Sequence, residues 1–284
     1  MAAFINTNIA SLNAQRNLNT SQASLATSLQ RLSSGMRINS AKDDAAGLAI
    51  ADRMTSSIRG NTVAMRNAND GISMAQTAEG SLSKVGDNLQ RMRELAVQSA
   101  NGTNTGADRT ALNTEFAELQ KEVTRVVAAT KYNGVDILGA GGVSLKFQVG
   151  SGTTAATDQI TVTGKDMTAG TSETFKAAQA ATIKIDGATE ANALAAITAI
   201  DSALTEVNSQ RTVYGAVQNR FESVVSNLQV SVESQSASRS RIMDADFASE
   251  TANLTRGQIL QQAGTAMLAQ ANSLPNGVLS LLRG

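Results

Sequence analysis

Apolar residues recur at alternating steps of four and three along most of this 284-residue chain. That spacing is typical of helices that pack against each other along one apolar stripe. The first such stripe passes through Leu18, Leu25, Leu29, Leu32 and Met36. A single proline, at position 275, leaves nearly the whole chain free of the residue that most strongly breaks helices. The sequence therefore predicts a mainly α fold of long helices.

Turn signals divide this pattern into segments. Gly35 follows two serines and closes the first helix, because glycine readily adopts the left-handed conformation found at helix ends. Ser40 and Asp43 form an S-x-x-D capping pattern that starts the second helix. A longer seam covers 72–96, past a turn signal at 69–71, and a similar seam covers 112–126. The short polar link between these two seams predicts an antiparallel helix hairpin.

The middle of the chain follows a different period. Residues 143–149 alternate between apolar and other side chains, and shorter alternations follow at Ile160 and Val162 and at Ile183 and Ile185. A period of two is typical of β-strands. Helical spacing returns over 194–228 and 247–281. We therefore expect long antiparallel helices forming a coiled coil and a rod-like bundle, with a small β-hairpin insert that is too short for a core of its own.

Composition excludes several classes of function. The chain has no histidine and no cysteine, so it can form no Ser-His-Asp triad, Cys-His pair, HExxH zinc site or disulfide. Basic and acidic residues number 24 each, which gives no net field to steer the protein toward nucleic acid or an anionic membrane. Polar residues interrupt every apolar run before it reaches the length of a membrane span. We expect a protein without catalytic site, cofactor or metal, and without nucleic-acid binding or membrane insertion.

Charge is scarce at both ends of the chain. Residues 1–30 hold one charged side chain, Arg16, and residues 257–282 hold none. A surface helix of a soluble monomer normally keeps a charged outer face. An uncharged polar face can instead be covered by neighbouring chains at low desolvation cost, because its side chains can hydrogen-bond to them. We therefore expect both terminal helices to be covered by identical chains in a helical homopolymer.

The apolar seams of the two ends are the candidate assembly core. Pairing of the ends would fold the chain as a hairpin with its middle facing outward. A thin coiled coil buries little area against the entropy of ordering both helices, so we expect it to become firm only among copies. The predicted core residues are Leu18, Leu25, Leu29, Leu32, Met36, Met267, Leu274, Val278 and Leu281.

Long strings at both ends resemble the bacterial flagellin family. Near the N-terminus these are INTNIASLNAQRNL, LQRLSSGMRINSAKDDAAGLAIADRM and RNANDGISMAQTAEGSL. The C-terminal string is SRIMDADFASETANLTRGQILQQAGTAMLAQANSLPNGVLSLLRG. The resemblance covers roughly the first 140 and the last 90 residues, and it implies a structural subunit of the flagellar filament used for swimming motility.

The resemblance also implies a domain organisation. Residues 1–44 and 241–284 would form the terminal coiled coil in the filament core, and 45–142 with 192–240 a helical rod domain. Residues 143–191 would form a β-hairpin and a short exposed insert, which is too short for the large outer domains of longer flagellins. Serines and threonines between Ser151 and Ser172 would then lie on the filament surface, where they would be available for O-linked glycans.

Partners and localisation follow from the same resemblance. The N-terminal residues 1–10 carry no Lys or Arg and no continuous apolar run, so no cleaved signal peptide is expected. Export through the flagellar secretion apparatus to the extracellular flagellum is implied instead. A flagellar export chaperone is expected on the C-terminal helix, and filament cap and hook-filament junction proteins are expected at the ends of the polymer.

A further matching segment is QRMRELAVQ at 90–98, which resembles the part of flagellin recognised by Toll-like receptor 5. By position, the resemblance carries over Gln90, Arg91 and Leu95, with Glu115 on the facing helix. The simpler interpretation of this segment is a solvated helix face that makes axial contacts between stacked subunits.

Two rival functions stay open at this stage. A hook-filament junction protein shares terminal coiled coils with flagellin, although its middle region is usually larger. An α/β enzyme in the central segment is the alternative from a different class, but that segment has no nucleophile-base pair and no cofactor loop. Filament formation distinguishes the flagellin hypothesis from both.

Overall fold

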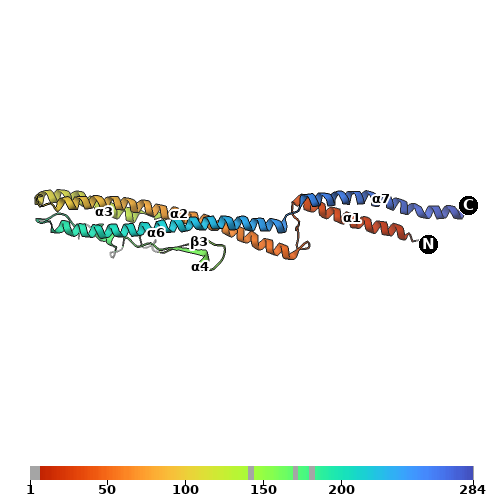
Figure 1. The fold of residues 1–284 in the computed structure, drawn as a ribbon, viewed down its shortest axis with the longest axis horizontal. Helices are drawn as coiled ribbons and strands as arrows, with labels where there is room; N and C mark the ends of the chain where they lie inside the picture. Colours follow the sequence, from red (N-terminus) through yellow and green to blue (C-terminus); the bar gives the residue numbers. More distant parts are fainter. Residues whose placement is uncertain (1–6, 140–143, 169–171, 179–182, 284) are drawn as a thin grey trace. The chain divides into compact units, whose positions relative to one another are not determined.

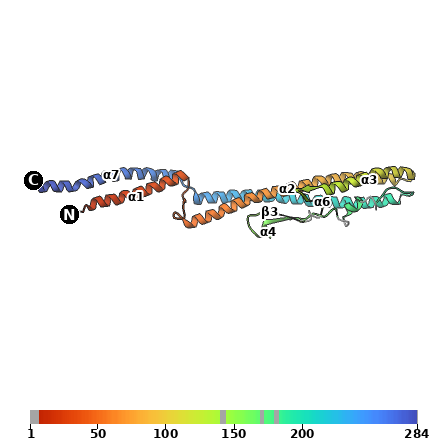
Figure 2. The ribbon, with the colours of Figure 1, turned by 180° about the vertical axis from the view of Figure 1, so that it is seen from behind.

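A computed structural model describes residues 7–139, 144–168, 172–178 and 183–283, with side chains described as far as Ser273. Figure 1 shows the chain as a ribbon, and Figure 2 shows it from behind. The chain divides into two compact units: a terminal unit, Met1–Ser56 with Ser234–Gly284, and a central unit, Ser57–Glu233. The domain limits expected at 44/45 and 240/241 stay a prediction.

Helices account for most of the described chain, and four short strands lie in its middle. The long helices are α1 (Ile9–Ser34), α2 (Ala45–Ser99), α3 (Gly106–Ala129), α6 (Ala191–Met243) and α7 (Phe247–Arg283). The short elements are β1 (Lys131–Tyr132), β2 (Val135–Asp136), β3 (Leu145–Gln148), α4 (Ala155–Asp158), β4 (Gln159–Val162) and α5 (Glu173–Ala178). The predicted mainly α fold with a small β-hairpin is confirmed.

In the terminal unit, α1 and α7 lie side by side and antiparallel. Gly35 has φ 69° at the end of α1, so the predicted helix end is confirmed. Its carbonyl oxygen accepts a 2.9 Å hydrogen bond from the Ala245 amide, and the Arg37 amide donates to the Met243 carbonyl at 2.6 Å. These two backbone bonds join the end of α1 to the end of α6 and the link before α7.

The predicted cap of the second helix needs a correction. Asp43 accepts hydrogen bonds from the Asn39 and Ser40 amides at 3.1 and 3.0 Å, but it belongs to a turn before the helix. The next residue, Asp44, accepts from the Gly47 amide at 2.8 Å and caps α2. The S-x-x-D pattern therefore marks a tight turn, and the helix starts immediately after it.

Helix α2 also continues past the point where the sequence predicts a break. It runs unbroken through Asn69-Asp70-Gly71, which sequence analysis treated as a turn signal. The side chain of Phe221 from α6 fills the space beside Gly71, where a Cβ atom would lie 2.6 Å from the ring. The glycine is thus used for close helix packing rather than for a turn.

The core of the central unit is built from α2, α3 and α6. Alanines make up much of it, which lets the helices approach closely, and a few large side chains fill the remaining space. The largest buried side chains of these three helices are Met74, Leu82, Leu89, Met92, Leu95, Phe116, Tyr214 and Phe221. In the described residues, the Tyr214 hydroxyl donates to the Ile137 carbonyl at 3.2 Å, which ties the residue after β2 to α6.

The predicted hairpin is confirmed as the antiparallel pair β3 and β4, with Phe147 opposite Ile160. Phe147 meets Phe221 edge to face, with ring centroids 5.4 Å apart, which fixes the hairpin on the helices. A second pair, β1 and β2, turns at Asn133 and Gly134, both with positive φ.

The strand predicted at Ile183 and Ile185 is absent from the described residues, and this prediction was wrong. Ile185 is buried, but side chains replace a neighbouring strand as its hydrogen-bond partners. Its amide donates to Asn113 Oδ1 at 3.0 Å, and its carbonyl accepts from Ser99 Oγ at 2.6 Å. The alternation of Ile183 and Ile185 therefore lies in a loop, which side chains of α2 and α3 hold in place.

Candidate assembly surface

The seam between α1 and α7 combines leucines with very small residues. The Cβ position of Gly264 would lie 3.1 Å from Leu18 Cδ1, and that of Gly257 would lie 3.1 Å from Leu25 Cδ1. Both leucines and both glycines are seven residues apart, so Leu18 and Leu25, two turns apart on α1, each meet a glycine of α7. Small residues at these positions allow the two helices to come close together.

Hydrogen bonds hold the seam at the start of α1. The side chain of Asn8 accepts from the Ser11 amide at 3.1 Å and donates to the Ala271 carbonyl at 2.7 Å. Ser11 Oγ also hydrogen-bonds to Asn272 Oδ1 at 2.7 Å. The side chain of Asn8 therefore both caps α1 and links it to α7. An uncharged amide can do this because it donates and accepts hydrogen bonds at the same time.

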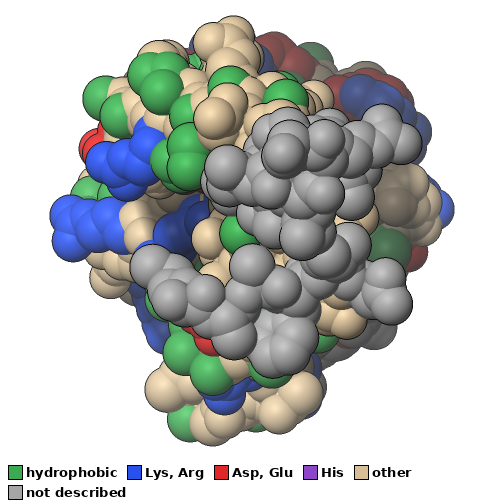
Figure 3. Space-filling view, turned by 90° about the vertical axis from the view of Figure 1, so that its right-hand side faces the viewer, with side chains coloured by type: hydrophobic (Ala, Val, Ile, Leu, Met, Phe, Trp, Pro, Cys, Tyr) green, Lys and Arg blue, Asp and Glu red, His purple; other side chains and the backbone are tan. Residues whose placement is uncertain are grey.

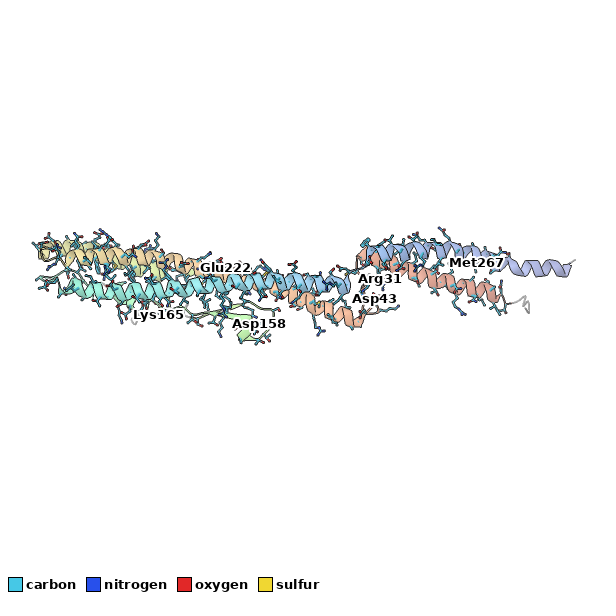
Figure 4. The ribbon with its side chains drawn as sticks, viewed as in Figure 1. Arg31, Asp43, Asp158, Lys165, Glu222 and Met267 are labelled. Carbon is cyan, nitrogen blue, oxygen red and sulfur yellow. The ribbon has the colours of Figure 1, made fainter. Side chains whose placement is uncertain are left out.

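The predicted assembly-core residues fall into three groups. Leu18, Leu25 and Leu32 are half-buried along α1. Leu29 and Met36 are 49% and 37% exposed. Met267 on α7, labelled in Figure 4, is 64% exposed. The helix α7 includes Leu274, Val278 and Leu281, but their side chains lie outside the described residues.

Sequence analysis missed Gly257 and Gly264 as seam residues. The signal that could have found them is their seven-residue spacing, which matches that of Leu18 and Leu25 when the helices run in opposite directions. The predicted stripe instead follows the larger side chains, of which Met267 remains exposed to solvent.

Apolar side chains other than Met267 also remain exposed on the terminal unit. Ile9 and Leu12 of α1, and Ile259 and Leu260 of α7, are all about half or more exposed. Seen from the side where the chain ends lie, hydrophobic side chains are exposed among polar and charged ones (Figure 3). Exposed apolar surface beyond scattered single residues marks an interaction site. The terminal unit therefore carries apolar surface that its own two helices do not cover.

A charged surface lies on the central unit, around Arg91 of α2. Arg91 Nη2 is 2.9 Å from Glu115 Oε1 of α3, and Nη1 is 2.9 Å from Glu94 Oε2. The hydrogen bonds to Glu94 and Glu115 raise the pKa of the Arg91 guanidinium. The structure thus brings Arg91 and Glu115 together, as the resemblance implied.

The other two residues of this predicted surface lie differently. Gln90 is exposed and lines a surface groove with Arg93 and Glu94. Leu95 is only 1% exposed and belongs to the helical core. Leu95 therefore supports the charged surface from below, and only Gln90, Arg91 and Glu115 are on it.

The described ranges also bear on other kinds of site. In those ranges, no group of three or more acidic side chains is placed to hold a metal ion. No helix there is long and apolar enough to cross a membrane. Long antiparallel helices with uncovered apolar faces define the class of helical structural proteins.

Comparison with known proteins gives the family. Residues 5–141 match the N-terminal helical region of bacterial flagellin, and residues 197–282 match its C-terminal helical region. Flagellin of Halalkalibacterium halodurans is 44% identical over 280 residues, covering 99% of this chain and 100% of that protein. Flagellin of Xenorhabdus nematophila is 44% identical over 321 residues, covering all of both chains. This chain belongs to the bacterial flagellin family and is a structural subunit of the extracellular flagellar filament.

A solved structure agrees on the fold. It is described as a flagellar hook-associated protein from Vibrio parahaemolyticus, with a TM-score of 0.59, 16% identity, and coverage of 71% of this chain and 100% of that chain. At this identity the likeness concerns the fold alone. Flagellin A of Vibrio cholerae aligns over 379 residues at 38% identity, covering all of both chains, so the 284-residue chain is a short form.

Proposed function

We propose that copies of this chain polymerise through the uncovered faces of α1 and α7. The observation that carries the proposal is the exposure of Met267, Leu29 and Ile259 on helices that have almost no charged outer face. Each large apolar side chain contributes about 1.5–3 kcal/mol when it is fully removed from water. Burial of several such side chains per subunit offsets the translational and rotational entropy that is lost on association.

The polar side chains of this surface can also contact another copy of the chain. Serine, threonine, asparagine and glutamine surround the exposed apolar residues, and these side chains can donate and accept hydrogen bonds across an interface. A contact between different faces of identical subunits propagates as a helical polymer when the rotation does not close a ring. The terminal unit would then become the filament core.

Further partners follow for a subunit of this kind. The open apolar residues of α7 need cover before assembly, which favours an export chaperone bound to this helix. Passage through the flagellar secretion apparatus suits a chain with neither cysteine nor disulfide, since it can travel unfolded. A cap protein would guide subunits at the growing end, and the junction protein would join the filament to the hook. This role needs no enzymatic activity.

The test is polymerisation of purified protein seeded with filament fragments, followed by electron microscopy. Met267→Asp should stop elongation, because it places a charge in a poorly hydrated contact. Met267→Gln is the matched control and should elongate at a reduced rate, since an uncharged polar group can hydrogen-bond there. Normal filaments from the aspartate variant would contradict the proposal, and particles without filaments from the unmodified chain would refute it.

A second candidate function is recognition by Toll-like receptor 5. It is favoured by the exposed pair Arg91 and Glu115, which presents a guanidinium and a carboxylate from two helices on one surface. Arg91→Ala should weaken stimulation of receptor-bearing cells by monomeric protein. Lys121→Ala, which removes a basic side chain elsewhere on α3, should leave it unchanged. If Arg91→Ala stimulated the cells as strongly as Lys121→Ala, the surface around Arg91 would not be the receptor contact.

A further inference from the structure

A polar groove of about 500 Å³ lies between α1 and α7 in the terminal unit. Arg31 of α1 faces it, as do Glu250, Asn253 and Arg256 of α7, with the small side chain of Ser28 between them. Figure 4 labels Arg31 near the end of α1. The groove is thus lined by two guanidinium groups and one carboxylate, on helices that carry few other charges.

The charges in this groove are poorly satisfied within the described part of the chain. Arg31 Nε is buried and has no hydrogen-bond partner there. Glu250 is only 8% exposed, and its carboxylate forms neither a hydrogen bond nor an ion pair with any described residue. Arg256 has one long contact, from Nη1 to Asn253 Oδ1 at 3.5 Å. Burying polar or charged groups without partners lowers the stability of the folded chain. The groove of the isolated chain therefore lacks partners for its charged groups.

The unpaired charges of the groove differ from the charged side chains of the central unit, many of which form ion pairs. All ion pairs among the described residues lie in the central unit. In the terminal unit, Asp43, Asp44 and Asp246 accept hydrogen bonds from backbone amides at turns and helix starts. These carboxylates are therefore engaged with the backbone, and the positive charge of Arg31 makes only the smallest contribution to the lowered pKa of Asp43. Neither arginine of the groove forms an ion pair with a described residue, so both are available to an acid from another source.

The charge balance of the chain points to that source. Of the 24 residues of each sign, the central unit holds 15 basic and 18 acidic ones, which leaves nine basic and six acidic in the terminal unit. Opposite net charges on two parts of one sequence favour contacts between different copies. Within a homopolymer, the acidic excess of one subunit is available to the basic groove of another.

We propose that an acidic side chain of a second copy of this chain enters the groove and pairs with Arg31 and Arg256. This inference rests on the proposed polymerisation and assigns one of its polar contacts. Glu250 then has a definite effect: its negative charge opposes the incoming carboxylate, while the two arginines attract it. The groove therefore tunes how tightly subunits associate.

The test is the critical concentration for polymerisation, measured by sedimentation at low and high salt. Arg31→Gln should raise it at least fivefold at low salt and flatten its salt dependence. Glu250→Gln should lower it, because the repulsive charge is gone. Arg59→Gln, an exposed arginine of the central unit outside the groove, is the matched control. Circular dichroism of each dispersed variant checks that folding is unchanged.

The opposite signs separate this inference from an ion pair within one chain. If Arg31 and Glu250 simply paired with each other, both substitutions would raise the critical concentration, and the inference would be overturned. Values equal to the control for both variants would overturn it as well, while leaving the proposed function intact. Failure of the unmodified chain to polymerise would instead overturn the proposed function and this inference together.

Discussion

The ring of Phe221 on α6 lies against the backbone of Gly71 on α2, with Cε2 and Cζ both 2.6 Å from the place of a Cβ atom. The same ring meets Phe147 of the hairpin edge to face. One side chain thus joins two long helices and the insert, and only glycine at position 71 allows it.

Gly71→Ala should therefore destabilise the central unit by about 1–3 kcal/mol, the usual cost of overpacking a core. Urea denaturation of dispersed protein measures this change. The matched control is Gly80→Ala in the same helix, where a Cβ atom would meet nothing within 4 Å. That control should stabilise by about 0.5–1 kcal/mol, because alanine favours helix. Equal effects of the two substitutions would show that Phe221 does not depend on Gly71.

Glu206 of α6 holds the segment around α5 in place. Its Oε2 accepts hydrogen bonds from Ser172 Oγ at 2.8 Å and from the Thr174 amide at 2.7 Å, and Lys165 pairs with Oε1. Burial raises the pKa of Glu206, but the ion pair with Lys165 and these hydrogen bonds outweigh burial and hold the pKa below its ordinary value.

A lowered pKa in the folded state fixes the sign of the pH dependence. The stabilisation by Glu206 is present above the pKa of the unfolded chain, about 4.3, and is lost as the pH falls through the lower folded value. Amide exchange in 172–178 should accelerate below about pH 4, and in Glu206→Gln it should be fast at neutral pH too. Glu222→Gln, an exposed glutamate on the same helix, serves as control. Unchanged exchange in the Glu206 variant would refute the role of this carboxylate.

Arg109 is a buried arginine whose partners are carbonyl groups. It is 3% exposed and donates to the carbonyls of Ser99 at 3.0 Å and of Asn101 and Gly187 at 3.4 Å. Its charge lies at the C-terminal end of α2, where the helix dipole favours a cation. It joins α2, α3 and the loop before α6.

Arg109→Met should lower the free energy of unfolding of the central unit by about 2–4 kcal/mol, because buried carbonyls lose their donors. Arg109→Lys should recover little, since an ammonium group cannot reproduce the planar array of guanidinium donors. Full recovery by lysine would mean that charge alone matters. Thermal denaturation followed by circular dichroism gives both values.

The terminal helices should gain protection on assembly. Their seam contains few fully buried side chains, so α1 and α7 should exchange amide hydrogens quickly in dispersed protein and slowly in filaments. The buried part of α2, such as Leu82 to Leu89, should be protected in both states. Strong protection of α1 in the dispersed chain would contradict the idea that copies order these helices.

The long helices could be predicted because each repeats its apolar spacing many times. The hairpin was equally readable, since Phe147 and Ile160 both face the core and their strands alternate regularly. Local chemistry also located the end of α1, where Gly35 adopts the left-handed conformation.

The errors arose where tertiary contacts decide the outcome. Gly71 looked like part of a turn, but the ring that occupies its space comes from 150 residues further along the chain. Ile185 looked like a strand residue, yet Asn113 and Ser99 satisfy its backbone groups. No local pattern shows such partners. The seam glycines Gly257 and Gly264 were missed because a residue without a side chain leaves no apolar signal.

The hydrogen bond from Asn8 to Ala271 spans 263 positions in sequence. Helix α1 is synthesised first, but the helix that covers it is made last. A product that stops before Phe247 leaves α1 with no helix to meet. Chains from incomplete translation therefore cannot form the seam between α1 and α7. Only a fully synthesised chain can present both helices for assembly.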